Sequence, residues 1–260
     1  MSAPLIVDVA EHIAHIRFNR PKALNALNVE LAEAFAQTCQ TLADDPDVRV
    51  VVLSGMGKVF MAGGDLQALR AAPVEAANQL IGPVHQAVRS LTQMAKPVIA
   101  SVHGAAAGAG MSVALACDLI IASRGTRFNY AYSDIGTCCD AGISWSLPRA
   151  VGLHKALEIA FLSDVIDADQ ALALGLVNQV VAPDELDDVT RECARRLAAR
   201  DAFALAKIKS LMRSAHTQPL STQLDAEHAA FVACARRPEF IQSIDDFYAS
   251  RSAPRQSQES

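Results

Sequence analysis

The pattern of apolar and polar residues in the first part of the chain is typical of strands that alternate with helices. Residues 5–18 alternate in polarity, which predicts a pair of half-buried strands. The apolar runs within 48–55 and 96–104 are short and bounded by turn residues, which predicts buried parallel strands. The segment 29–45 has the periodicity of a helix, with Asn28 as its N-cap. Strands alternating with helices of this length predict an α/β fold.

The pattern changes at Pro148, after which it predicts a succession of amphipathic helices and no further strands. We therefore expect two parts: a core at residues 1–195 and an all-helical region at residues 196–260. Within the core, Pro73 and Pro83 leave open where the helices around them begin and end.

Composition and charge exclude several classes of protein. Of the 260 residues, 51% are apolar, which is enough for a large core. A net charge of −5, without a block of like charges, argues against a nucleic-acid partner. The absence of a long apolar run and of an export signal predicts a cytoplasmic protein with no membrane partner. The six cysteines have no CxxC spacing and no histidines at zinc-ligand intervals, so we expect no metal site.

Two glycine-containing loops, 60–66 and 103–111, follow predicted strands. A phosphate-binding loop is excluded, because neither loop has the spacing of a P-loop or a dinucleotide-binding motif. Two alternatives remain. The glycines allow close packing of strand against helix, or they allow two backbone N–H groups to point at one substrate oxygen. The second N–H would then lie at the start of a helix near Ala109, where the helix dipole favours negative charge.

Five sequence blocks occur in a recognisable order: RPKALNAL (20–27), GKVFMAGGDL (57–66), KPVIASVHGAAAGAGMSVALACDLIIAS (96–123), IGTCCDAGISWSLPRAVG (135–152) and ALALGLVNQVV (171–181). Together they resemble the crotonase family, also called the enoyl-CoA hydratase/isomerase superfamily, across about residues 5–250. The resemblance implies a crotonase fold of stacked ββα units and an acyl-CoA thioester as substrate, with no metal or organic cofactor. It also implies that the C-terminal helical region packs on a neighbouring subunit in a homotrimer, or in a hexamer built as a dimer of trimers.

In the family, two backbone N–H groups form an oxyanion hole that binds the thioester oxygen and stabilises an enolate. By resemblance these N–H groups belong to Gly64 and Ala109. The resemblance also implies that four residues line the path of CoA: Ala23, Ala62, Asp65 and Leu66.

The chain departs from the family pattern at the positions that define a hydratase. A family hydratase uses two glutamates to activate and deliver water, and the matching positions here are Ser112 and Tyr132. Neither side chain can act as a carboxylate base at neutral pH, so hydration by two glutamates is in doubt. Asp140 matches the catalytic aspartate of family isomerases, and it also matches the nucleophilic aspartate of the 4-chlorobenzoyl-CoA dehalogenase.

The prediction that requires fewest residues is an enoyl-CoA isomerase, in which Asp140 and the oxyanion hole carry out a 1,3-proton shift. Three alternatives stay open: an enoyl-CoA hydratase of fatty-acid β-oxidation, a dehalogenase-like hydrolase, and a non-catalytic CoA-binding scaffold in which Asp140 pairs with Arg149 or is exposed. His85 matches the catalytic histidine of the dehalogenase, and is otherwise a residue on a helix surface. Trp145 is predicted to lie in the core or in the wall of the site.

Overall fold

The computed structural model describes residues 3–162 and 164–252, and contacts divide the chain into two units, Met1–Arg200 and Asp201–Ser260. The division lies five residues beyond the expected boundary after residue 195. The reason is helix α8 (Leu186–Ala198), which belongs to the first unit because its buried side chains pack on apolar residues of the sheet, among them Val52 and Ile99.

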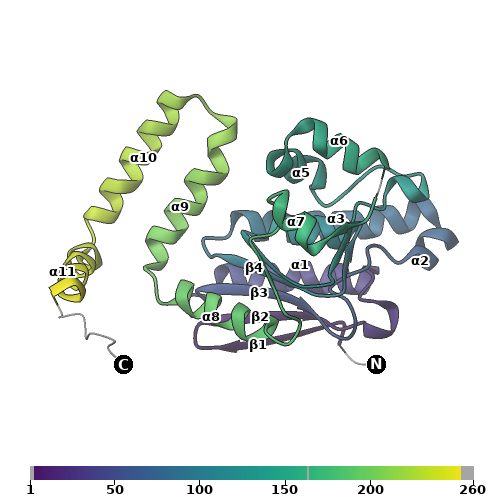
Figure 1. Cartoon of the computed structure of the whole chain (residues 1–260), viewed down its shortest axis with the longest axis horizontal. Coiled ribbons are helices and arrows are strands. Elements are labelled where there is room, and N and C mark those ends of the chain that lie inside the picture. The colour runs from purple at the N-terminus through teal and green to yellow at the C-terminus, as the bar shows by residue number, and fades with distance from the viewer. Residues whose placement is uncertain (1–2, 163, 253–260) are drawn as a thin grey trace, which may run out of the picture. The chain divides into compact units, whose positions relative to one another are not determined.

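In the described part of the first unit, the main sheet has six strands in the order β1-β2-β3-β4-β6-β9. Figure 1 labels the first four of them, which lie side by side. β1 (Leu5–Ala10) and β2 (Ile13–Phe18) form the antiparallel pair that the alternation predicts. The strands that follow in the order are parallel: β3 (Val50–Gly55), β4 (Val98–Val102), β6 (Leu119–Ser123) and β9 (Gln179–Val181). β3 and β4 are buried along almost their whole length, as their apolar runs predict.

A second, smaller sheet consists of β5 (Ala105–Ala107), β7 (Arg127–Asn129) and β8 (Ile166–Asp167). β8 and β9 contradict the prediction that only helices follow Pro148. Strands of two and three residues are too short to show alternation, and β9 forms by pairing with the edge of β6. Next to β9, the side-chain oxygen of Asn178 accepts a hydrogen bond from the Ile120 N–H at 2.7 Å.

The helices that precede α8 in the first unit cover the sheets and frame the site. Their bounds are α1 (Val29–Asp44), α2 (Leu66–Ala71), α3 (Pro73–Gln93), α4 (Ala109–Ala116), α5 (Ile143–Val151), α6 (Leu153–Leu162) and α7 (Ala168–Ala173). The Asn28 side chain caps α1 as predicted, accepting a hydrogen bond from the Leu31 N–H at 3.0 Å. Pro73 begins α3, and Pro83 lies inside it. Among the described residues, no helix is long and apolar enough to cross a membrane.

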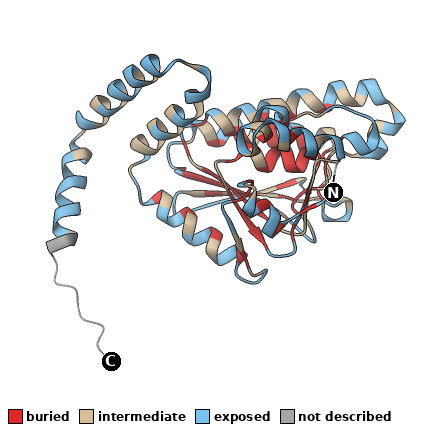
Figure 2. Cartoon of the chain, turned by 45° about the horizontal axis from the view of Figure 1, so that its top comes forward, coloured by how far each residue is buried: buried red, intermediate tan, exposed pale blue. Residues whose placement is uncertain are grey.

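The buried residues gather in the sheet and in the helices that pack against it (Figure 2). Phe18 of β2 contacts Phe35 of α1 and Phe60 edge to face, with ring centroids 5.1 and 5.5 Å apart. Phe60 and Met61 are both 0% exposed. They anchor the start of the loop that continues through Gly63 and Gly64, so the core fixes one wall of the site.

The described part of the second unit consists of α9 (Ala202–Ser214), α10 (Leu220–Ala235) and α11 (Pro238–Ser252). A short 3₁₀ turn, Ala215–Thr217, lies between α9 and α10. Burial is described for residues 201–249 of this unit, and none of these residues is buried. Large apolar side chains are instead exposed, including those of Met212, Leu220, Phe231, Ile241 and Phe247. Helices obtain most of their stability from packing an apolar face, and these exposed side chains are available for such packing.

Replacing Asp201 with alanine is expected to destabilise the second unit in a pH-dependent way. The Asp201 carboxylate caps α9, accepting a hydrogen bond from the Ala204 N–H at 2.7 Å, and pairs with Arg237 at 2.7 Å. The hydrogen bond from Arg237 is the main cause that lowers the pKa of Asp201. A lowered folded pKa means that the stabilisation is complete above the unfolded pKa of about 3.9 and is lost as pH falls through the folded pKa.

The loss for Asp201→Ala at neutral pH should be about 1 kcal/mol, the usual cost of removing an N-cap. The measurement is the free energy of unfolding of the full chain, followed by helical circular dichroism from pH 7 to about pH 3. The difference between variant and wild type should shrink below about pH 4. Asp225→Ala, at an exposed position of α10, is the control and should cause no such loss. A deficit that stays constant down to the lowest pH would contradict the prediction.

Candidate active site

A cavity of about 200 Å³ lies in the first unit, between α2 and α3 on one side and the loops that follow β5 and β7 on the other. Its apolar lining comes largely from α2 and α3, and includes Leu66, Leu69, Leu80, Ile81 and Val84. Its polar lining is confined to the main chain of both glycine loops and to the segment Ala131–Asp140. A small apolar chamber with a few converging polar groups is typical of a ligand site.

The two predicted oxyanion-hole residues, Gly64 and Ala109, both line this cavity. Ala109 is the first residue of α4, so its N–H lies beyond the reach of the helix's own carbonyls. Gly64 pairs with Leu27 in an isolated bridge whose hydrogen bonds use the Gly63 carbonyl and the Asp65 N–H. Among the described residues, neither the Gly64 nor the Ala109 N–H has a hydrogen-bond acceptor. Both are therefore available to a ligand oxygen.

The alternative explanation of the glycines, close packing, also applies, but to different residues. A Cβ added at Gly110 would lie 2.2 Å from the Met61 carbonyl oxygen, and one added at Gly104 would lie 2.0 Å from that of Lys58. Gly63 instead has a φ of +101°, a conformation that residues with a side chain rarely adopt. The glycines thus bring the two loops together and turn the chain where the free N–H groups meet the cavity.

Asp140 lines the same cavity and is the one carboxylate among the described lining residues. Its Oδ1 accepts a hydrogen bond from the Tyr132 hydroxyl, and the Tyr132 oxygen lies 2.9 Å from Ser112 Oγ. The positions matched to the hydratase glutamates therefore carry two hydroxyl groups that contact each other, and one of them, that of Tyr132, also donates to Asp140. Burial, and then the negative charge of Asp140, raise the pKa of Tyr132 far above its ordinary value. Tyr132 is thus a neutral hydrogen-bond donor at physiological pH.

A turn in left-handed conformation holds the backbone next to Asp140. Ala141 has a φ of +50° and Gly142 has a φ of +80°, and α5 begins directly after them. The Ala141 N–H donates to Nε2 of His85, on α3, at 3.2 Å. His85 does not line the cavity, although the family resemblance suggested that it lies in the site. It is half-buried and supports the turn that presents Asp140.

Trp145 is neither in the core nor in the cavity wall, which corrects the prediction made for it. Its side chain is 41% exposed, and the Arg149 guanidinium lies 4.1 Å from the centroid of its ring. Arg149 also donates to the Trp145 carbonyl oxygen at 2.7 Å. The ion pair between Asp140 and Arg149, which the scaffold alternative would use, is not formed.

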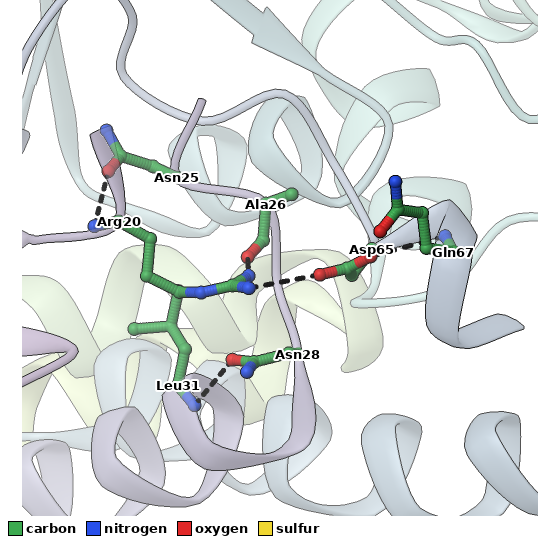
Figure 3. Close-up of polar contacts among 7 residues, drawn as sticks. All are labelled: Arg20, Asn25, Ala26, Asn28, Leu31, Asp65 and Gln67. Carbon is green, nitrogen blue, oxygen red and sulfur yellow. Dashed lines mark hydrogen bonds and ion pairs between the residues drawn. The ribbon is translucent and has the colours of Figure 1, made fainter. Parts of the chain in front are cut away.

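The four residues assigned to the CoA path do not all face the cavity. Ala62 and Leu66 line it. Ala23 lies in a 3₁₀ turn (Pro21–Ala23) of the loop that precedes α1, and the Ala62 N–H donates to the carbonyl of the adjacent Leu24 at 3.1 Å. The Asp65 carboxylate faces Arg20, with 3.1 Å between Arg20 Nη2 and Oδ2, and it caps α2 through the Gln67 N–H (Figure 3).

Sequence reasoning missed Asn25, which joins the loop before α1 to the segment that leads into the first glycine loop. It is 0% exposed, and its side-chain nitrogen donates to the carbonyl oxygens of Met56, Val59 and Phe60 at 2.9 to 3.1 Å. Its side-chain oxygen accepts a hydrogen bond from the Arg20 N–H. The available signal was an amide residue within the otherwise apolar run ALNAL (23–27), where a buried polar side chain must find partners.

Replacing Arg20 with methionine is expected to loosen the loop that carries Gly64. Arg20 donates to the Ala26 carbonyl oxygen and pairs with Asp65, the residue after Gly64 (Figure 3). Both charged side chains are mostly buried. The free energy of unfolding should fall by about 1.5 to 3 kcal/mol, a magnitude usual for hydrogen bonds to charged groups. Chemical denaturation measures this loss. Lys22→Met, at an exposed position two residues away, should change stability by less than about 0.5 kcal/mol. Equal stability of the two variants would contradict the prediction.

In the described part of the chain, no set of three or more His, Cys, Asp and Glu side chains is placed to hold a metal ion. Cofactor independence itself stays a prediction from the family resemblance.

Comparison with known proteins agrees with this geometry. The sequence model of the enoyl-CoA hydratase/isomerase family matches residues 8–258. A 1,2-epoxyphenylacetyl-CoA isomerase of Escherichia coli (strain K12) is 35% identical, covering 95% of this chain and 96% of the relative. A crotonyl-CoA hydratase of Syntrophomonas wolfei is 30% identical, covering 96% of each chain.

Similarity extends to three dimensions. The crystal structure of an enoyl-CoA hydratase from Polaromonas sp. JS666 superposes with a TM-score of 0.89 at 35% identity, covering 95% of this chain and 97% of that one. This match confirms the α/β crotonase fold with a helical C-terminal region. The chain therefore belongs to the enoyl-CoA hydratase/isomerase family.

Proposed function

We propose that the protein is an enoyl-CoA isomerase that moves a double bond by means of a single carboxylate. The observation that carries the proposal is that Asp140 is the one carboxylate among the described residues that line the cavity, while Ser112 and Tyr132 occupy the positions of the hydratase glutamates. A 1,3-proton shift needs one group that accepts a proton and later returns it. Hydration needs a second group that activates water, and the described lining of the cavity offers no second carboxylate.

In the proposed reaction, the thioester oxygen of a 3-enoyl-CoA accepts hydrogen bonds from the Gly64 and Ala109 N–H groups. Asp140 removes a proton from C2, and the electron pair of the broken C–H bond delocalises into a dienolate. The negative charge on the thioester oxygen is stabilised by the two N–H groups. Asp140 then returns the proton at C4, which leaves a 2-enoyl-CoA. Every step uses groups of this chain, so the proposal includes no metal and no organic cofactor.

Dehalogenase-like hydrolysis receives less support from the site. Hydrolysis of an aryl intermediate requires a base for water, and His85 is the residue that sequence comparison offers for this role. Its Nε2 already accepts the Ala141 N–H, and the side chain does not line the cavity. A non-catalytic scaffold is also disfavoured, because Asp140 faces the cavity rather than an arginine.

The test is a panel of thioesters assayed with the purified protein: 3-enoyl-CoA, crotonyl-CoA, epoxyphenylacetyl-CoA and 4-chlorobenzoyl-CoA. Isomerisation, hydration and chloride release are each followed separately. We expect isomerisation of 3-enoyl-CoA or of the ring-derived thioester to have the highest kcat/KM. Faster hydration of crotonyl-CoA would overturn the isomerase proposal in favour of a hydratase, and chloride release would favour the hydrolase.

We also propose that the second unit packs on further copies of the chain, in a homotrimer or a dimer of trimers. The support is the absence of any buried residue among positions 201–249, together with the exposed apolar side chains of α9, α10 and α11. Sedimentation equilibrium should give three or six times the 27.6 kDa mass of the chain. A monomer at micromolar concentration would contradict this assembly.

A further inference from the structure

We propose that Tyr132, held by Ser112, is a positioning residue. It binds one carboxylate oxygen of Asp140 and shields that oxygen from solvent, so that the other oxygen carries the substrate proton. This inference rests on the proposed isomerase function. It concerns the two side chains that replace the hydratase glutamates, and it assigns them a role in the proton shift rather than in the activation of water.

The directions of the hydrogen bonds follow from the chemistry of the groups. An ionised carboxylate can only accept, so the contact between Tyr132 and Asp140 Oδ1 is a donation from the phenol. The hydroxyl hydrogen of Tyr132 is thereby used, and its oxygen can only accept from Ser112 Oγ, 2.9 Å away. The series of hydrogen bonds therefore runs from Ser112, which donates to Tyr132, to Tyr132, which donates to Asp140.

The series ends inside the protein. Ser112 is 0% exposed and Tyr132 is 7% exposed. The other acceptor within reach of Ser112 Oγ is the Gly108 carbonyl oxygen, at 3.1 Å, which has no proton to give and cannot retain one. A proton on Asp140 therefore has no route to bulk water through Tyr132 and Ser112.

As a consequence, the two carboxylate oxygens have different roles in catalysis. Oδ1 is occupied by the phenol, and this bond fixes the plane of the carboxyl group. Oδ2 is left for the substrate in the cavity that Asp140 lines. When the substrate fills the cavity and displaces its water, the proton on Oδ2 is more readily returned to the same substrate molecule than exchanged. A fixed carboxylate also keeps the reacting atoms in the productive orientation.

The experiment measures turnover of 3-hexenoyl-CoA in D₂O, with deuterium at C4 of the product determined by mass spectrometry at low conversion. The wild-type enzyme should place deuterium in well under half of the product molecules. Tyr132→Phe should lower kcat by about tenfold, leave KM within about twofold, and raise the labelled share to a majority. Ser112→Ala should act in the same direction with a smaller effect.

Tyr130→Phe is the matched control. Its ring contacts Tyr132 edge to face at 5.1 Å, and the removed hydroxyl donates no hydrogen bond to Asp140. This variant should retain the wild-type labelling pattern. Tyr132→Phe should fold, because the Ser112 hydroxyl hydrogen can then turn to the Gly108 carbonyl oxygen, 3.1 Å away, and a denaturation curve checks this.

The outcomes separate this inference from the proposed function. Turnover with one deuterium at C4 in every wild-type product molecule would overturn the role of Tyr132 but not the isomerase. Unchanged kcat and labelling in Tyr132→Phe would do the same. The absence of any isomerisation by the wild type would overturn the proposed function, and this inference with it.

Discussion

Asp140→Asn is expected to lower kcat for isomerisation by about 10³-fold, within the 10² to 10⁴ range usual for loss of a general acid–base group. The amide has nearly the shape of the carboxylate, and its oxygen can still accept the hydrogen bond from Tyr132. The amide nitrogen, however, is not a base and cannot take a proton from C2. Initial rates with a 3-enoyl-CoA, and calorimetric binding of a saturated acyl-CoA, separate loss of chemistry from loss of binding.

The control for Asp140→Asn is Asp134→Asn, an exposed residue of the same segment that does not line the cavity. It should retain the wild-type kcat within about twofold, as expected for a surface substitution. Loss of both turnover and acyl-CoA binding in Asp140→Asn would indicate a structural role for Asp140. Retention of turnover would place the proton shift on another group and refute the mechanism.

Much of the fold could be predicted because its elements carry their own local pattern. The runs that became β3 and β4 are apolar without interruption, and strands covered on both faces by helices require this composition. Asn28 caps α1 through a contact between residues three apart, so the sequence alone contains the whole motif. β8 and β9 could not be predicted in this way, because their short segments become strands only where a neighbouring strand edge exists.

The contacts within the candidate site could be predicted from the sequence even less than the short strands. Ser112 and Tyr132 are 20 residues apart, and Arg20 and Asp65 are 45 apart, so no spacing rule joins either pair. Resemblance to the family identified the positions of Asp65, Ser112 and Tyr132 but not their contacts. Trp145 was placed wrongly because an aromatic residue near a catalytic motif is expected to be buried, whereas α5 turns this side chain toward solvent.

Ala109→Pro is expected to lower kcat/KM for isomerisation by about 10² to 10³-fold, the usual loss when one oxyanion-hole donor is removed. Ala109 is the first residue of α4, the position at which a helix tolerates proline best, because the N–H there has no partner within the helix. The substitution therefore removes the N–H that is proposed to bind the thioester oxygen, and it places the Cδ of the ring where the hydrogen pointed. The preceding residue is Gly108 with φ +49° and ψ −121°, outside the α region that a following proline disfavours.

The comparison that isolates the N–H is Ala109→Gly, which keeps the donor and removes only a buried methyl group. This variant should retain kcat/KM within about fivefold, and any loss should follow from a modest drop in stability, since glycine costs roughly 1 kcal/mol in a helix. Steady-state kinetics of both variants, at a temperature well below their unfolding transitions, provides the test. Full activity in Ala109→Pro would show that the thioester oxygen is bound elsewhere. A glycine variant as inactive as the proline variant would show that the methyl group, rather than the N–H, is what the site needs from Ala109.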